Sequence, residues 1–134
     1  MILSSLSGIS ALLLPIIGGI LLFASDVVLP AVIPDFPAAA AWLGQLLAGA
    51  WLGMAALNWL QRTATLGGIY GRPTVVANLV LYFISTLSLL RALLGPGGPP
   101  MLWFAVVIGG VMVTAYGALL LRGPPGVPKL PATG

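Results

Sequence analysis

Four long runs of hydrophobic residues dominate the chain, and short stretches rich in Pro, Gly or charged residues separate them. The runs extend over about 6–24, 38–60, 73–94 and 101–121. Each has roughly the 20 residues with which an α-helix crosses the hydrocarbon core of a bilayer. In lipid the backbone must satisfy its own hydrogen bonds, as a helix does. The pattern therefore predicts an all-α integral membrane protein, an antiparallel four-transmembrane-helix bundle with neighbouring spans joined by short loops.

Proline and glycine set the expected ends of these helices. Pro15 lies inside the first run and predicts a kink there. Asp26 is expected to end the first span. The segment 27–37 contains three prolines, so we expect it not to be helical, and either to lie along the membrane surface or to pack over the helix ends. The glycine pair 67–68 and the Gly/Pro stretch 95–100 are the other predicted helix stops.

Residues 1–122 are expected to form a single transmembrane domain, and 123–134 a flexible, Pro/Gly-rich cytoplasmic tail. The first run is longer than the hydrophobic core of a signal peptide and has no Lys or Arg before it, so we interpret it as a retained span. Residues 130–134 match the Leu-Pro-x-Thr-Gly pattern that sortases recognise. The predicted topology places this tail inside the cell, which argues against anchoring to a cell wall.

The few charged residues predict an orientation. Five basic and two acidic side chains give a net charge of +3. Four of the basic residues fall on the side of the predicted topology that holds both termini, namely Arg62, Arg72, Arg122 and Lys129. Since positive charge is retained on the cytoplasmic side, we expect both termini to be cytoplasmic. We expect the membrane to be a bacterial plasma (inner) membrane.

The composition removes most kinds of chemical site. The chain contains no His and no Cys, and its only carboxylates are Asp26 and Asp35. Metal ligation and general acid–base catalysis depend mainly on these missing side chains. The basic residues are scattered among the spans, unlike the clustered patch of a nucleic-acid-binding protein. We therefore expect no metal, no cofactor, no catalytic residue and no nucleic-acid partner.

Polar and aromatic residues concentrate around the predicted connection between the second and third spans. Asn58 and Asn78 should face each other and pair, because amides in apolar surroundings need partners. One interpretation is helix packing. The other is a pocket near the cytoplasmic leaflet for an anionic or amphipathic ligand, such as a lipid head group or a quinone. The candidate residues of this pocket are Asn58, Arg62, Tyr70, Arg72, Asn78 and Tyr82.

Small residues form smooth faces on two of the predicted helices. On the second span, Gly49 and Gly53 make a small-x-x-x-small motif. The fourth span carries a comparable face with Gly110, Thr114 and Gly117. Such faces allow helices to approach closely in lipid. They predict either packing within the bundle or contact with another subunit or a second copy.

A further candidate is an ion pair between Asp26 and Arg91, both expected near the outer edge of the bilayer. Ionisable groups at membrane depth are functional candidates, although Arg91 can also extend to water. Taken together, the residues favour a small non-enzymatic accessory or assembly subunit of a larger membrane complex, in contact with lipids. The alternatives are a small oligomeric transporter or channel, or a lipid- or quinone-binding protein.

Overall fold

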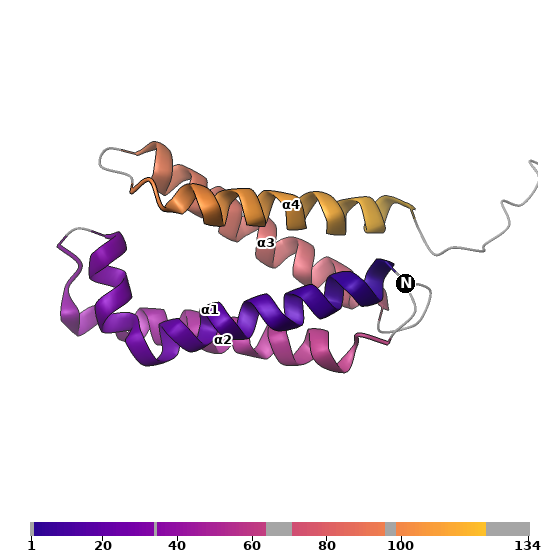
Figure 1. The fold of residues 1–134 in the computed structure, drawn as a ribbon, viewed down its shortest axis with the longest axis horizontal. Helices are drawn as coiled ribbons and strands as arrows, with labels where there is room; N and C mark the ends of the chain where they lie inside the picture. Colours follow the sequence, from indigo (N-terminus) through magenta and orange to yellow (C-terminus); the bar gives the residue numbers. More distant parts are fainter. Residues whose placement is uncertain (1, 34, 64–70, 96–98, 123–134) are drawn as a thin grey trace, which may run out of the picture.

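The computed structural model describes residues 2–33, 35–63, 71–95 and 99–122, and within them it is all-helical (Figure 1). Its four long helices are α1 (Ile2–Val32), α2 (Trp42–Leu60), α3 (Gly71–Leu94) and α4 (Leu102–Arg122). A short 3₁₀ turn, η1 (Ala38–Ala40), precedes α2. All four helices are long and apolar enough to span a membrane, which confirms this part of the prediction.

Helix α1 is longer than predicted, and its break is in a different place. The backbone leaves helical geometry at Ala24 (φ −132°, ψ 27°), whereas Pro15 lies within the helix. The segment after Ala24 is helical as far as Val32, so the prediction of an irregular segment from residue 27 was wrong for these residues. Pro30 is accommodated in this helical segment, and α1 ends just before the Ile33-Pro34 step, where the residue preceding a proline disfavours the helix.

The helices form two pairs. Helix α1 packs along α2 and α3 packs along α4, whereas few contacts join one pair to the other. Consecutive helices run in opposite directions, and the start of α1 lies at the same end of the molecule as the finish of α4 (Figure 1). The helix ends that carry Arg62, Arg72 and Arg122 also lie at this end.

Glycine brings the backbones together inside each pair. A Cβ atom placed on Gly18 of α1 would lie 3.3 Å from the carbonyl oxygen of Ala48 in α2. One placed on Gly44 would lie 2.8 Å from Cβ of Ser25, so the segment of α1 beyond the break is also fitted closely to α2. In the other pair, Gly109 of α4 packs directly against the hydroxyl group of Thr86 in α3.

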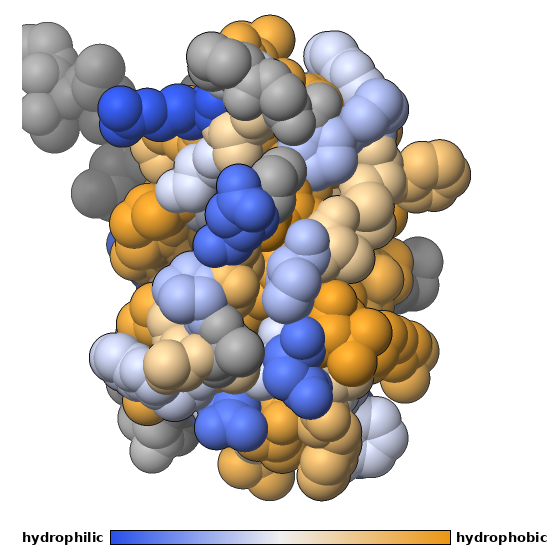
Figure 2. All heavy atoms as spheres, turned by 90° about the vertical axis from the view of Figure 1, so that its left-hand side faces the viewer, coloured by the Kyte–Doolittle hydropathy of each residue, from blue (hydrophilic) through white to orange (hydrophobic). Residues whose placement is uncertain are grey.

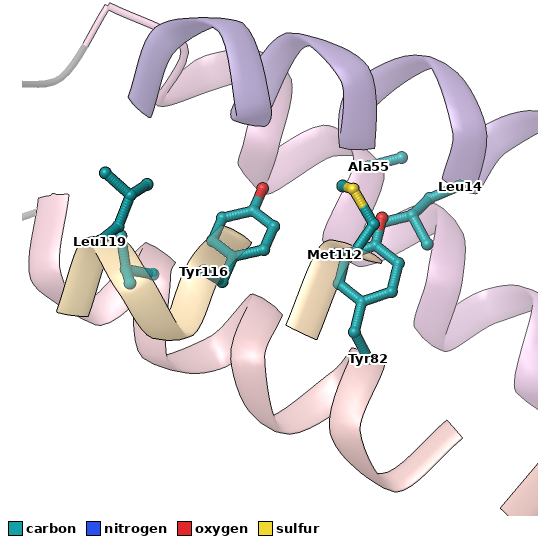
Figure 3. Close-up of a cluster of buried hydrophobic side chains, with 7 residues drawn as sticks. Leu14, Ala55, Tyr82, Met112, Tyr116 and Leu119 are labelled. Carbon is teal, nitrogen blue, oxygen red and sulfur yellow. The ribbon is translucent and has the colours of Figure 1, made fainter. Parts of the chain in front are cut away.

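All four helices contribute to one buried hydrophobic cluster (Figure 3). Its members are Leu14, Ala55, Val75, Tyr82, Met112, Tyr116 and Leu119. The sides of the bundle are instead covered with exposed apolar residues, such as Phe23, which is 86% exposed, and Phe104, which is 81% exposed. This distribution is the one expected of helices whose outer surfaces contact lipid.

Hydrophilic residues gather at the end of the molecule where α2 and α4 begin. Figure 2 views this end directly, and blue residues cross its middle between flanks of orange, hydrophobic residues. The exposed polar side chains of the elements that meet here include Asp26, Asp35, Gln45 and Arg91. A polar end between apolar sides is what a bundle crossing a bilayer would present to water.

Candidate functional site

A pair of buried amides joins the two helix pairs. Asn58 of α2 donates from Nδ2 to Oδ1 of Asn78 in α3 at 2.8 Å, and Asn78 returns the bond from its own Nδ2 to Oδ1 of Asn58 at 2.9 Å. Both side chains are fully buried. The predicted pairing of these residues is therefore present, in a reciprocal, two-bond form.

The remaining amide hydrogens are used within the helices. Nδ2 of Asn58 also donates to the carbonyl oxygen of Met54, and Nδ2 of Asn78 donates to that of Thr74, each at 2.8 Å. A carboxamide has two N–H donors. Each asparagine thus directs one donor to its partner and one to the preceding turn of its own helix, and neither retains a donor for a ligand.

Three hydroxyl groups extend the amide pair across the bundle. The hydroxyl of Tyr82 donates to Oγ of Ser10 at 3.0 Å, and Oγ of Ser10 lies 2.8 Å from the hydroxyl oxygen of Tyr116. The Tyr116 hydroxyl in turn donates to Oδ1 of Asn58, in the longest bond of the series at 3.5 Å. Because Tyr116 uses its only hydrogen on Asn58, Ser10 must donate to Tyr116. The hydrogen bonds therefore run in one direction, from Tyr82 to Ser10, Tyr116 and finally Asn58.

We call Ser10, Asn58, Asn78, Tyr82 and Tyr116 the polar network. Four of its members are fully buried and Tyr82 is 8% exposed. The rings of Tyr82 and Tyr116 stack with centroids 5.9 Å apart and planes at 17°, and their hydroxyl ends point towards α1 and α2 (Figure 3). Every N–H and O–H donor of the network has an acceptor within it or on the adjacent backbone. The arrangement is a closed set of hydrogen bonds between helices.

Sequence reasoning identified Asn58, Asn78 and Tyr82 but not Ser10 or Tyr116. Ser10 belongs to a group of serines early in the first hydrophobic run, and nothing in the sequence shows which of these serines is buried. Tyr116 stands alone in an apolar run. Tyr116 lies at the same level of the bundle as Asn78 only when α3 and α4 pair as an antiparallel hairpin. The sequence pattern predicts such a hairpin but not which residues of the two helices lie side by side.

The basic and aromatic residues of the predicted pocket do not assemble around the amides. Arg62 folds back on its own helix: its guanidinium lies 4.0 Å from the centre of the Trp59 ring, and Nη1 donates to the Trp59 carbonyl oxygen at 2.7 Å. Arg62 and Arg72 are both exposed. Tyr70 lies outside the described residues. The structure thus brings together Asn58, Asn78 and Tyr82, and leaves Arg62 at the surface.

The predicted small-residue faces point outwards. A Cβ atom on Gly49, Gly53 or Gly110 would meet no atom within 4 Å, and Gly49 and Gly53 are exposed. Thr114 is also exposed and bonds to the carbonyl oxygen of Gly110 in its own helix. Only Gly117 approaches a neighbour, with Leu79 at 4.0 Å. Packing within the bundle therefore does not use Gly49, Gly53 or Gly110.

The predicted pairing of Asp26 with Arg91 does not occur. Both side chains are exposed and belong to different helix pairs, α1/α2 and α3/α4, and in the described part of the chain no ion pair connects them. After the break at Ala24, the end of α1 turns upwards in Figure 1, and its Ser25 and Leu29 lie beside Gly44 of α2. Three buried polar atoms have no hydrogen-bond partner among the described residues, namely Oγ of Ser7, Nε1 of Trp51 and Oγ1 of Thr86.

No group of three or more His, Cys, Asp or Glu side chains that could hold a metal ion occurs within the described residues. Searches against protein-family models, curated proteins and solved structures found no match for this chain.

Proposed function

We propose that this chain is a non-enzymatic, multi-pass protein of a bacterial plasma membrane and acts as an accessory or assembly subunit of a larger membrane complex. Both termini would lie in the cytoplasm, because the positively charged helix ends share the side of the bundle on which α1 starts and α4 finishes. Membrane lipids would cover the exposed apolar sides of the helices.

The observation that carries this proposal is an outward face of glycines on the α1/α2 pair. At the crossing of the two helices, Gly18 and Ala48 face each other. The next residue on each helix is rotated by about 100°, and in antiparallel helices both rotations lead to the same side of the pair. Gly19 and Gly49 accordingly lie on one face, and neither would meet an atom within 4 Å if it carried a Cβ.

Gly53 lies one turn from Gly49 on α2, and Gly8 lies three turns from Gly19 on α1, and both are equally open. We call Gly8, Gly19, Gly49 and Gly53 the glycine face. The polar network emerges on the other side of the same pair, towards α3 and α4. The glycine face is therefore directed away from the rest of the bundle.

A glycine face is suited to contact with another transmembrane helix. Helices in lipid gain association energy from close van der Waals packing, and small residues allow the backbones to approach. The glycines that this chain uses internally are already occupied by Ala48, Ser25 or Thr86. The open glycines would provide the same kind of close approach to a helix of a different subunit.

The polar network does not favour the ligand-binding alternatives. A pocket for a lipid head group or quinone would need free donors at Asn58, Asn78 or Tyr82, and these donors are all bonded to protein atoms. The same residues therefore support a structural role.

The proposal can be tested by extracting the protein from its native membrane with a mild polymer and measuring the particle mass and composition. We expect an assembly that contains this chain in a fixed ratio to another protein. Gly49→Leu/Gly53→Leu should release the chain from it. The matched control is Ser88→Leu/Ala92→Leu, with the same spacing at exposed positions of α3. A wild-type particle containing only this chain and lipid would contradict the proposal.

A further inference from the structure

The contacts within each helix pair differ from the contacts that hold the two pairs to each other. Within α1/α2, close contacts occur where Gly18 meets Ala48 and where Gly44 meets Ser25, about one turn apart on α2. Within α3/α4, Gly109 is pressed against Thr86, and Gly117 approaches Leu79 further along. Most of the contacts between helices lie within the two pairs. The bent end of α1 belongs to the α1/α2 pair, because it lies on α2 at Gly44.

The hydrophobic cluster shared by the two pairs lies in one half of the bundle. The shared hydrophobic cluster extends from Leu119 and Val75 to Leu14, Ala55, Tyr82 and Met112. These residues come from the first half of α1 and α3 and the second half of α2 and α4, which is the half nearest the start of α1. Towards the other end, α3 moves away from α2 and the straight part of α1, and the bent end of α1 rises on the side of α3 and α4 (Figure 1).

The polar network lies in this half and links the pairs directly. Ser10 and Asn58 belong to α1/α2, whereas Asn78, Tyr82 and Tyr116 belong to α3/α4. Every hydrogen bond between two side chains of the network crosses from one pair to the other. A reciprocal amide pair requires a defined geometry, so it fixes the relative position of the helices at one level while leaving distant levels unconstrained.

We propose that α1/α2 and α3/α4 are two rigid bodies that swing about the polar network. The network acts as a pivot in the half of the bundle where α1 starts, and the ends where α2 and α4 begin move apart and together. The motion is of the hinge type, in which packed units keep their internal contacts and a small region absorbs the change. This inference goes beyond the proposed subunit role and does not depend on it.

The chain has no cysteine, so pairs of introduced cysteines can be spin-labelled and their separations measured in lipid nanodiscs. Labels at Phe23 and Phe104 measure the distance between the two helix pairs at the end where α2 and α4 begin. Labels at Phe23 and Leu46 measure a distance within α1/α2. Leu60 with Val76 reports across the pairs near the network. All five side chains are exposed, so the labels should be accommodated without disturbing buried contacts.

We expect a broad or two-peaked distance distribution for Phe23–Phe104, and narrow single distributions for Phe23–Leu46 and Leu60–Val76. In the Asn58→Leu/Asn78→Leu background, the Leu60–Val76 distribution should broaden while Phe23–Leu46 stays narrow, because the pivot is lost and the α1/α2 pair is not. Equally narrow distributions for all three pairs in the otherwise unaltered protein would overturn the proposal. The proposal would also be overturned if the distance distribution for Leu60–Val76 were as broad as that for Phe23–Phe104.

Discussion

At the scale of single residues, the most informative feature is that two amides and three hydroxyl groups are buried in an otherwise apolar bundle. Asn58 and Asn78 are fully buried and have all their N–H donors bonded. Leaving a buried polar group without a partner costs more than the bond itself contributes. The network therefore favours one particular pairing of helices over alternatives in which these groups would be unpaired.

This predicts non-additive effects of substitution at the two asparagines. Asn58→Leu alone should destabilise the protein by about 1–3 kcal/mol, because Asn78 and Tyr116 lose their partner. Asn58→Leu/Asn78→Leu should cost less than the sum of the two single changes, by about 0.6–1.7 kcal/mol, which are the average and the largest coupling energies for side-chain hydrogen bonds between membrane helices. Reversible unfolding in mixed detergent, followed by helical content, measures these differences.

Gln45→Leu is the matched control, since it removes an exposed amide from the same helix. It should change the free energy of unfolding by no more than about 0.5 kcal/mol, as surface substitutions usually do. Additive effects of the two asparagine substitutions would contradict the reciprocal pair.

The amide pair was predictable because Asn58 and Asn78 flank a short connection, so antiparallel pairing brings them to one level. The hydroxyl partners were not. A tyrosine or serine in an apolar run carries no periodic signal of which neighbour it contacts. Placing Ser10 beside Tyr116 requires knowing how the first and fourth helices pack, and the two residues are 106 positions apart in the sequence.

At the scale of the helices, some glycines pack against a neighbouring helix and others face open space. Gly109 and Gly110 are neighbours in α4, yet a Cβ on Gly109 would overlap the hydroxyl of Thr86, whereas one on Gly110 would meet nothing within 4 Å. Sequence reasoning selected Gly49, Gly53 and Gly110 from their spacing. Spacing identifies small residues on a shared face, but it does not show whether that face points inwards.

Alanine substitution at these two positions should therefore have different effects. Gly109→Ala should destabilise the protein by about 1–3 kcal/mol, the usual cost of added volume in a filled contact. Gly110→Ala should be neutral or slightly stabilising, because alanine is the better helix former and the space is open. Thermal unfolding in detergent distinguishes the two.

Thr86→Ala should recover part of the stability lost in Gly109→Ala, because it removes the hydroxyl that the new methyl group would displace. Equal stabilities of the Gly109→Ala and Gly110→Ala proteins would show that α3 and α4 do not meet at Gly109.

Helix α1 shows why the segment after the first predicted span was predicted incorrectly. Three prolines in 27–37 suggested irregular structure, but only Pro30 lies within the helix, and packing of Ser25 and Leu29 on Gly44 holds that segment against α2. This contact is between different helices. Local sequence rules do not include it.

At the scale of the whole molecule, the lengths of the hydrophobic runs were sufficient to predict an all-helical fold with four long helices. Four runs of apolar residues became four helices, each long enough to cross a bilayer. The division into two pairs that share a core over only half of their length was not predictable. It depends on where Gly18, Gly44 and Gly109 allow close approach and where the polar network ends.

The same division separates the surfaces by role. The inner side of α1/α2 carries Ser10 and Asn58, which belong to the network. Its outer side carries Gly49 and Gly53, which closely approach no neighbour among the described residues. The central claim is that the outer side contacts another protein helix in the native membrane, while the other sides of the bundle contact lipid.

Site-specific photo-cross-linking in the native membrane tests this claim most directly. A photoreactive residue at Ala56 lies on the exposed side of α2 that carries Gly49 and Gly53, and one at Phe83 lies on an exposed part of α3. We predict a single protein adduct of fixed mass from Ala56, lost in Gly49→Leu/Gly53→Leu, and only lipid adducts from Phe83. Lipid adducts alone at both positions would contradict the account.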